Sequence, residues 1–411
     1  MKKVTTILCI LISFIGYGQS WFELPNAPAG QGRFDDVFFL NEDLGWAANG
    51  PSGRVYKTTD AGQNWQLQYT HPGYNRNIEF LDENIGFLGT LESIFYKTTN
   101  GGDTWEQVSM SPNPNAICGL DAVGTSTVYG CGAWFSPAHV IKSTDAGENW
   151  TYKDMSAHAE ALVEVLFIDE LHGYVSGASD QGGIILETLD GGDSWTEIFN
   201  TNVQGDYIWK MQLMENNTLI IGSVQSNSQG KLVRSADSGA TWEVYNAPEN
   251  FVQAVGFVTP QRGWMGGHNT GFHETNDGGQ TWSDIGLGFS LNRFFFIDSS
   301  VAYCSGETIY KYEDEFGISD FGGAKREDLK IVVAPNPVKD ELVVEIHFEY
   351  TDNLLLDLYD LNGRWIKRLK RDQIPGPEIK RYTFDFNYPA GSYFLDIHTN
   401  NGRRTRSLIK N

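Results

Sequence analysis

Positive charge is scarce in this sequence. The chain carries 30 Lys and Arg residues against 52 Asp and Glu, a formal net charge of −22 at pH 7. The imbalance is local, because residues 21–320 hold 13 basic and 39 acidic residues whereas residues 321–411 hold 15 and 13. So acidic a segment disfavours nucleic acid and anionic membrane surfaces, and favours sugars, peptides or cations as partners. The alternative is that the acidity only keeps a secreted protein soluble.

Cysteine is also rare. Cys9 lies in an N-terminal apolar run, which leaves Cys118, Cys131 and Cys304, too few for a disulfide scaffold. Core packing must therefore hold the fold together. We expect Cys118 and Cys131 on successive strands, so a cross-strand disulfide and two free thiols both remain open.

No apolar run is long enough to span a bilayer. The longest runs from Ile7 to Ile15, after Lys2 and Lys3, and it ends in the small-residue segment Gly16-Tyr17-Gly18. This pattern predicts a secretory signal peptide over residues 1–18 and no transmembrane segment.

What the chain has in quantity is glycine, aromatic residues and a repeat. There are 45 glycines and 13% aromatic residues, which suits many short strands separated by tight turns. A Ser/Thr-x-Asp-x-Gly-x-x-Trp pattern occurs six times, at intervals of 40 to 47 residues, the spacing of propeller blades. Its polar residues are Asp60, Asn100, Asp145, Asp190, Asp237 and Asp277, and its tryptophans are Trp65, Trp105, Trp150, Trp195, Trp242 and Trp282.

The pattern has a physical interpretation as a hairpin turn. The Asp or Asn side chain folds back onto turn amides, the glycine supplies a positive φ, and the tryptophan packs between neighbouring blades. The pattern resembles the Asp box of sialidase-type propellers. That resemblance implies that these residues are structural and lie on the rim, away from the ligand face.

A second pattern, an apolar strand, an acidic turn and a Gly-aromatic strand, occurs seven times. Residues 309–314 begin a seventh box that never reaches its tryptophan, whereas residues 21–24 resemble the strand that follows each box. We therefore expect the N-terminal strand to complete the last blade and close the ring. The predicted fold is all-β: a seven-bladed β-propeller over residues 19–316 and a small C-terminal β-sandwich.

The C-terminal part begins after a polar, glycine-containing linker, which we place at residues 317–329. Residues 330–411 contain, in order, Ala334-Pro335-Asn336-Pro337, the run 358–364 (LYDLNGR), the run 389–395 (PAGSYFL) and the basic end 407–410 (SLIK). These motifs resemble the type A C-terminal sorting domain of the type IX secretion system of Bacteroidetes. The resemblance implies that the export machinery is a partner and that the chain reaches the outer-membrane surface or the medium. An ordinary adhesive sandwich is the alternative.

The Phe-x-Asp, Gly-Trp and Thr-Thr-Asp-Gly-Gly-type elements of residues 21–312 also resemble the photosystem II assembly and stability factor family. This implies a non-catalytic assembly or binding platform. We predict no cofactor. The histidines at 71, 139, 158, 172, 268 and 273 are scattered singly, which predicts no metal site.

The rival hypothesis is a glycosidase, because sialidases and xyloglucan-cleaving enzymes use Asp-box propellers. Such an enzyme needs two facing carboxylates. The candidates in loops of the expected ligand face are Glu92, Glu160, Asp180 and Asp206.

We predict instead a binding surface for an unknown glycan or protein ligand on the face opposite the box turns. Loops that enter the first strand of each blade and leave the second share that face, and they carry aromatic residues among polar ones. The candidates are Arg33, Tyr74, Arg76, Trp134, Phe135, His158, Tyr207, Trp209, His268 and Arg293.

Overall fold

A computed structural model of the chain describes residues 20–28, 32–132, 137–214, 217–298, 301–313, 330–348, 352–360, 365–399 and 402–410. The predicted signal peptide, the predicted linker, Trp134 and Phe135 lie outside these residues. The described residues are all strand, turn and loop, and none of their segments is a helix that could cross a membrane. The chain divides into one compact unit over Trp21–Tyr312 and another built by its C-terminal part.

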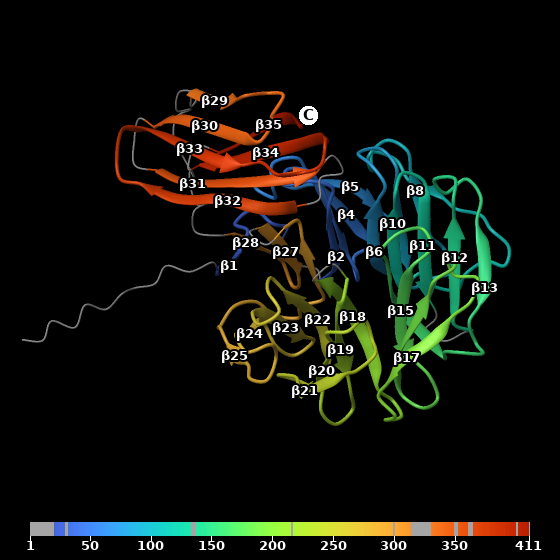
Figure 1. The fold of residues 1–411 in the computed structure, drawn as a ribbon. Coiled ribbons are helices and arrows are strands. Elements are labelled where there is room, and N and C mark those ends of the chain that lie inside the picture. The colour runs from blue at the N-terminus through green and yellow to red at the C-terminus, as the bar shows by residue number, and fades with distance from the viewer. Residues whose placement is uncertain are drawn as a thin grey trace, which may run out of the picture. The chain divides into compact units, whose positions relative to one another are not determined.

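The first unit is a β-propeller whose described residues form seven four-stranded antiparallel sheets (Figure 1). The first sheet is β2 (Phe34–Phe39), β3 (Gly45–Asn49), β4 (Arg54–Thr58) and β5 (Gln66–Thr70). The second is β6 (Asn75–Phe80), β7 (Gly86–Thr90), β8 (Tyr96–Thr98) and β9 (Glu106–Gln107). The third is β10 (Gly119–Val123), β11 (Thr127–Gly132), β12 (His139–Ser143) and β13 (Thr151–Asp154). The fourth is β14 (Ala161–Phe167), β15 (Gly173–Ala178), β16 (Gly183–Thr188) and β17 (Thr196–Asn200).

The remaining sheets continue the same order and close the ring. The fifth is β18 (Tyr207–Met214), β19 (Leu219–Gln225), β20 (Lys231–Ser235) and β21 (Glu243–Asn246). The sixth is β22 (Val252–Phe257), β23 (Gly263–Gly267), β24 (His273–Thr275) and β25 (Ser283–Asp284). The seventh is β26 (Arg293–Phe296), β27 (Val301–Ser305), β28 (Ile309–Glu313) and the N-terminal β1 (Ser20–Glu23). Each first strand contacts the first strand of the next sheet, and β26 contacts β2.

The N-terminal strand has the role predicted for it. β1 is the outermost strand of the seventh sheet, beside β28, and the Leu24 amide donates to the Ile309 carbonyl at 3.1 Å. The Trp21 ring packs on Trp264 and Phe272 of the sixth sheet. The N-terminal segment is therefore held to the last strand of the ring by backbone pairing and by apolar contacts, and β1 covers the edge that β28 would otherwise expose.

Each repeated hairpin turn lies between the third and fourth strands of its sheet and has one hydrogen-bond pattern. In the fourth sheet the Thr188 hydroxyl donates to Asp190 Oδ1 at 2.8 Å and accepts from the Gly192 amide at 2.9 Å. Asp190 also accepts from the Ser194 amide and hydroxyl, at 2.9 and 2.6 Å. These bonds keep the pKa of Asp190 near 2, below its ordinary value, because they stabilise the carboxylate. The same glycine has a positive φ in all six turns, for example 94° at Gly192.

The tryptophan after each turn packs against the preceding sheet. Trp150 of the third sheet contacts Phe87 and Phe95 of the second edge to face, and Trp242 of the fifth lies 4.6 Å from Phe199 of the fourth. Each such ring adds apolar contact between neighbouring sheets, whose strands do not pair with one another.

The C-terminal unit contains a three-stranded sheet and a four-stranded sheet around one apolar core. In β30 (Glu341–Phe348) buried residues alternate with less buried ones. The first sheet has the order β29 (Lys330–Ala334), β30 (Glu341–Phe348), β33 (Glu378–Asp385). The second has the order β32 (Trp365–Ile374), β31 (Asp352–Asp360), β34 (Gly391–Thr399), β35 (Gly402–Lys410). The Asn336 side chain bonds to the Ser407 carbonyl and the Ile409 amide, which ties the first and last of the sequence motifs together.

The cysteine question is answered in favour of thiols. Cys118, Cys131 and Cys304 are all buried, and Cys131 and Cys304 are free thiols, so Cys131 does not form the cross-strand disulfide. The Cys118 amide donates to the Cys131 carbonyl, but in the register it is Gly119, not Cys118, that lies opposite Cys131. The two side chains belong to separate apolar clusters.

Candidate binding cavity at the propeller centre

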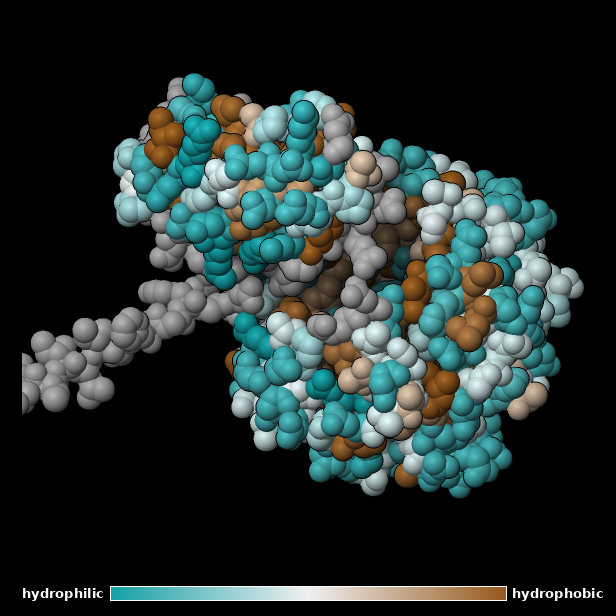
Figure 2. All heavy atoms as spheres, viewed as in Figure 1, coloured by the Kyte–Doolittle hydropathy of each residue, from teal (hydrophilic) through white to brown (hydrophobic). Residues whose placement is uncertain are grey.

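The propeller is hollowed at its centre, where apolar side chains gather inside a largely hydrophilic surface (Figure 2). Two cavities of about 430 and about 420 Å³ lie there. The strand register shows that they open at opposite ends of the inner strands. In the first sheet Phe34 pairs with Asn49, which pairs with Arg54, whereas Phe39 pairs with Gly45, which pairs with Thr58 at the hairpin turn. Residues near Phe34 therefore lie at the end opposite the hairpin turns.

We call the cavity at that end the entry cavity, because residues at the start of the inner strands line it. Five of the predicted binding residues lie there together. Its wall consists of Arg33, Asp35, Tyr74, Arg76, Leu91, Cys118, Val163, Trp209, Gln225, Phe251, Gln253 and His268.

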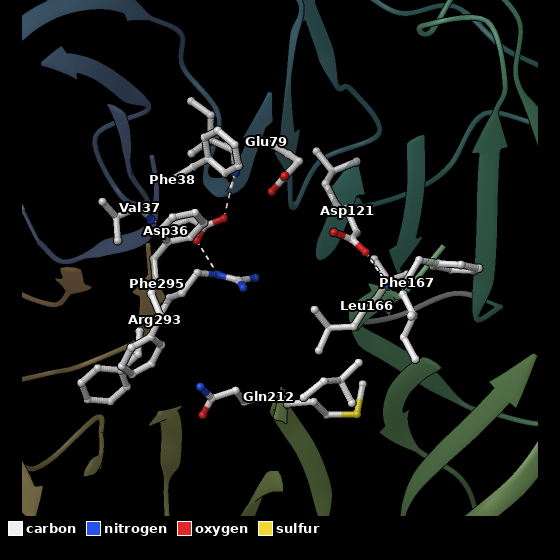
Figure 3. Close-up of a pocket in the computed structure, with 18 of the residues that line it drawn as sticks. Asp36, Val37, Phe38, Glu79, Asp121, Leu166, Phe167, Gln212, Arg293 and Phe295 are labelled. Atoms are coloured by element: carbon white, nitrogen blue, oxygen red, sulfur yellow. Dashed lines mark hydrogen bonds and ion pairs between the residues drawn. The ribbon is translucent and has the colours of Figure 1, made fainter. Parts of the chain in front are cut away.

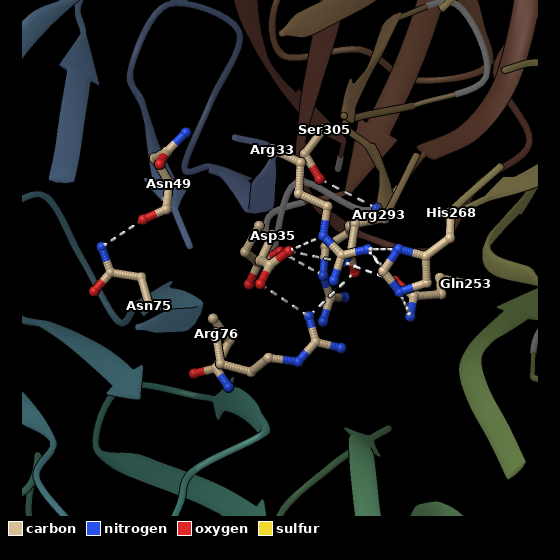
Figure 4. A network of polar contacts seen from close by, with 12 residues as sticks. Arg33, Asp35, Asn49, Asn75, Arg76, Gln253, His268, Arg293 and Ser305 are labelled. Carbon is tan, nitrogen blue, oxygen red and sulfur yellow. Dashed lines mark hydrogen bonds and ion pairs between the residues drawn. The ribbon is translucent and has the colours of Figure 1, made fainter. Parts of the chain in front are cut away.

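A polar network organises the floor of the entry cavity (Figure 4). Arg33 forms an ion pair with Asp35, and its Nη1 donates to Gln253 Oε1 at 2.6 Å. Nε2 of Gln253 in turn lies 2.9 Å from Nε2 of His268. Burial, and then the neighbouring Arg33, lower the pKa of His268 to about 4, so its imidazole is uncharged at neutral pH.

Arg76 comes from the inner strand β6 and is only 3% exposed. Its Nη1 donates to Asn292 Oδ1 at 3.3 Å and lies 3.7 Å from Asp35. Its guanidinium carbon lies 5.2 Å from the ring centroid of Trp209, which is a cation–π contact. Among the described residues, Arg76 Nη2 has no hydrogen-bond partner, and neither has Gln225 Oε1.

Tyr74 is held at the rim by its backbone. Its amide donates to both carboxylate oxygens of Glu92 at 3.0 Å. Burial, and then the charge of Asp35, raise the pKa of the Tyr74 hydroxyl to about 12. Glu92 therefore fixes the loop that carries Tyr74. The four carboxylates that the sequence suggested for a glycosidase, Glu92, Glu160, Asp180 and Asp206, do not line either cavity.

Other predicted binding residues lie elsewhere. His158 is exposed and outside both cavities, and Tyr207 is half-buried against Trp209 in an apolar cluster. Arg293 was placed on this face by the sequence argument, but it lines the cavity at the other end. Its guanidinium pairs with Asp36 and Glu164 there, because ion pairing offsets the cost of burying the charges of all three side chains.

That second cavity, which we call the turn-side cavity, is lined by acidic and aromatic residues (Figure 3). Burial raises the pKa of Asp121 to about 7, and burial together with the charges of Asp121 and Asp36 raises that of Glu79 well above its usual range. Behind the cavity, Lys210 Nζ donates to Glu164 at 2.6 Å, and burial lowers its pKa to about 8. Among the described residues, no three His, Cys, Asp or Glu side chains are grouped to hold a metal ion.

This charged centre was not predicted from the sequence, although the sequence contains a signal for it. In the first, fourth and seventh sheets the third residue before the last aromatic residue of the inner strand is charged: Asp36, Glu164 and Arg293. In the first and fourth sheets of the propeller a β-bulge shifts the strand register just before this charged residue. The shift lies between Phe34 and Asp36 in β2 and between Leu162 and Glu164 in β14. An inward charge at one repeat position, compared across blades, indicates a polar channel.

Comparisons with known proteins identify the C-terminal unit and the propeller fold. Residues 332–411 match the family model described as the secretion system C-terminal sorting domain. This tail marks the chain for type IX export. The chain therefore reaches the cell surface or the medium.

The propeller is similar to several solved structures. A structure of YCF48 bound to D1 peptide has 18% identity and a TM-score of 0.56, over 72% of this chain and 96% of that one. PorZ, a surface component of the type IX secretion system of Porphyromonas gingivalis, has 11% identity and a TM-score of 0.54, over 95% of this chain and 61% of that one. The GH74 xyloglucanase of Xanthomonas campestris has 14% identity and a TM-score of 0.55, over 80% and 59%. These likenesses establish the β-propeller fold, and no curated protein matches the chain.

Proposed function

We propose that the chain is an exported, non-enzymatic binding protein: a seven-bladed Asp-box propeller that holds a protein or glycan ligand in the entry cavity. Residues 1–18 direct it to the periplasm and the C-terminal tail directs it onward. The observation that carries the proposal is the convergence of Arg33, Tyr74, Arg76, Trp209 and His268 on one concave site. Aromatic faces beside a few fixed polar groups are the usual composition of a ligand site.

Two further facts support binding without chemistry at this site. Asp35 is the one carboxylate in the wall of the entry cavity, and Arg33 and Arg76 both lie against it. Glycoside hydrolysis needs two carboxyl groups across the scissile bond. In addition, the YCF48 structure, which has the same fold, was solved with a peptide bound.

A glycoside hydrolase of the sialidase or xyloglucanase type is the second candidate. What favours it is the turn-side cavity, where Glu79 and Asp121 both have raised pKa values, as a general acid requires. The fold shared with a xyloglucanase is consistent with it.

One experiment separates the candidates. The full chain is screened on an array of peptides and glycans, and then again as Tyr74→Ala and as Glu79→Gln. We expect binding of the probes to be abolished or weakened at least tenfold in Tyr74→Ala and to be unchanged in Glu79→Gln. Every arrayed glycan should remain intact. Binding unchanged in Tyr74→Ala would refute the entry cavity as the site, and glycan cleavage that Glu79→Gln abolishes would establish the hydrolase.

A further inference from the structure

We propose that the entry cavity recognises a carboxylate carried by an apolar peptide segment, with Arg76 binding the carboxylate and Gln225 accepting a peptide N–H. The proposal rests on the proposed function and specifies the ligand class of that same site. It starts from a mismatch in hydrogen bonding. The buried side-chain atoms that have no hydrogen-bond partner among the described residues include three from the cavity wall: the cationic donor Arg76 Nη2 and the acceptors Gln225 Oε1 and Asp35 Oδ2. Asp35 already has ion-pair contacts with Arg33 and Arg76, which leaves Arg76 Nη2 and Gln225 Oε1 for a ligand.

The donor is the stronger indication. Arg76 is 3% exposed, and its other contacts leave one edge of the guanidinium unused. Buried polar groups in native proteins are nearly always hydrogen-bonded, and a charged one most of all. An oxygen supplied by a ligand would satisfy Nη2, while the cation–π contact with Trp209 holds the guanidinium in place.

The charge of the wall matches one negative charge. Its charged side chains are Arg33, Arg76 and Asp35, and His268 is neutral at pH 7, so the cavity has a net charge of +1 within a strongly acidic propeller. A carboxylate carries one charge and is planar like the guanidinium edge, whereas a phosphate monoester carries nearly two. The cavity therefore favours a carboxylate over a phosphate.

The rest of the wall favours a peptide over an acidic sugar. Leu91 and Phe251, which are 37% and 39% exposed, line the entry cavity, and so does the buried Val163. These side chains offer no hydrogen bonds to sugar hydroxyls, but they suit an apolar side chain. A peptide also brings the N–H donor that Gln225 Oε1 lacks.

The test is a fluorescence anisotropy titration of the full chain with three labelled heptapeptides of otherwise identical sequence. The first ends in Leu-Phe with a free carboxylate, the second is its C-terminal amide, and the third is the amide with an internal Glu before Leu-Phe. We expect the first, the third or both to bind at least tenfold more tightly than the uncharged amide. The first and third distinguish a terminal from a side-chain carboxylate.

Two variants and one control locate the binding. Arg76→Gln and Gln225→Leu should each lower the affinity for the preferred peptide at least tenfold. Gln225 is only half-buried, so Gln225→Leu keeps the test valid if Arg76→Gln does not fold. Arg262→Gln is the matched control. Arg262 also lies 5.2 Å from a tryptophan ring, that of Trp264, but it is outside the cavity, so binding should be unchanged.

Three results would overturn the carboxylate proposal. The first is equal affinity for the acid and amide peptides, and the second is unchanged affinity in both variants. The third is the absence of saturable binding at peptide concentrations up to about 1 mM, the dissociation constant of a weak complex. A neutral glycan that binds, and is lost in Tyr74→Ala, would leave the binding function standing while the carboxylate proposal fails. If no probe depends on an entry-cavity residue, both fail.

Discussion

Asn100 in the second sheet and Asp190 in the fourth occupy the same position of the hairpin turn and accept the same hydrogen bond. Asn100 Oδ1 accepts from the Thr104 amide at 2.9 Å, and Asp190 Oδ1 accepts from the Ser194 amide at 2.9 Å. The hydroxyl of that same residue makes a second bond in both turns: Thr104 accepts from the Asn100 side-chain amide, and Ser194 donates to Asp190 Oδ2. The turn therefore needs a side-chain oxygen at this position, but not a charge.

This equivalence leads to a prediction about acid stability. Hydrogen bonds lower the pKa of Asp190 and Asp277 to about 2, so these carboxylates stabilise the fold above the ordinary value of 3.8 and lose that contribution as the pH falls towards 2. We expect Asp190→Asn with Asp277→Asn to fold and to flatten the dependence of Tm on pH between 4 and 2. Calorimetry across that range measures it. A double variant whose Tm falls as steeply as the wild type would contradict the prediction.

A second position in the turns shows a conformational conflict. Ala61, Ala146 and Ser238 have φ of 58°, 57° and 58°, where the other three turns have Gly101, Gly191 and Gly278. A residue with a Cβ is strained there, by roughly 1 kcal/mol. We expect Ala146→Gly to raise the free energy of unfolding by up to about 1 kcal/mol. The greater conformational entropy that glycine loses on folding offsets part of this gain. Thermal denaturation measures it, with Ala122→Gly in strand β10, where φ is negative, as a control that should destabilise.

The repeated turns could be predicted from the sequence and the charged centre could not, for a physical reason. The box repeat is local: Thr188, Asp190 and Gly192 are within five residues, so their spacing was enough to predict the turn. The closure by Trp21 followed from counting strands. The central charges could not be placed in this way, because Asp36, Glu164 and Arg293 meet only after seven sheets close, and no local spacing encodes a distance across the ring. The same limit explains why Arg293 was assigned to the wrong end.

The charged centre predicts an unusual pH dependence near neutrality. Burial raises the pKa of Asp121 from its ordinary 3.8 to about 7, so the neutral form is favoured in the fold and stability is lost as the pH rises between these values. Asp121→Asn keeps an oxygen for the Phe167 amide and carries no charge. We expect this variant to have a higher Tm than the wild type at pH 8 and nearly the same Tm at pH 4. A variant with a lower Tm at both pH values would show that Asp121 stabilises as a carboxylate.

The export tail gives the last prediction. The propeller closes its ring with β1 and β28, and no described strand of the C-terminal unit joins a propeller sheet. A chain that ends before Leu329 should therefore fold with nearly the full-length Tm of the propeller, because its core and its strand pairing are all retained. It should nevertheless accumulate in the periplasm, since it lacks residues 332–411, which match the sorting domain. Cell fractionation with protease accessibility measures this, and full-length protein carrying the conservative Val332→Ile change is the control. Truncated propeller on the cell surface would mean that another part of the chain carries the export signal.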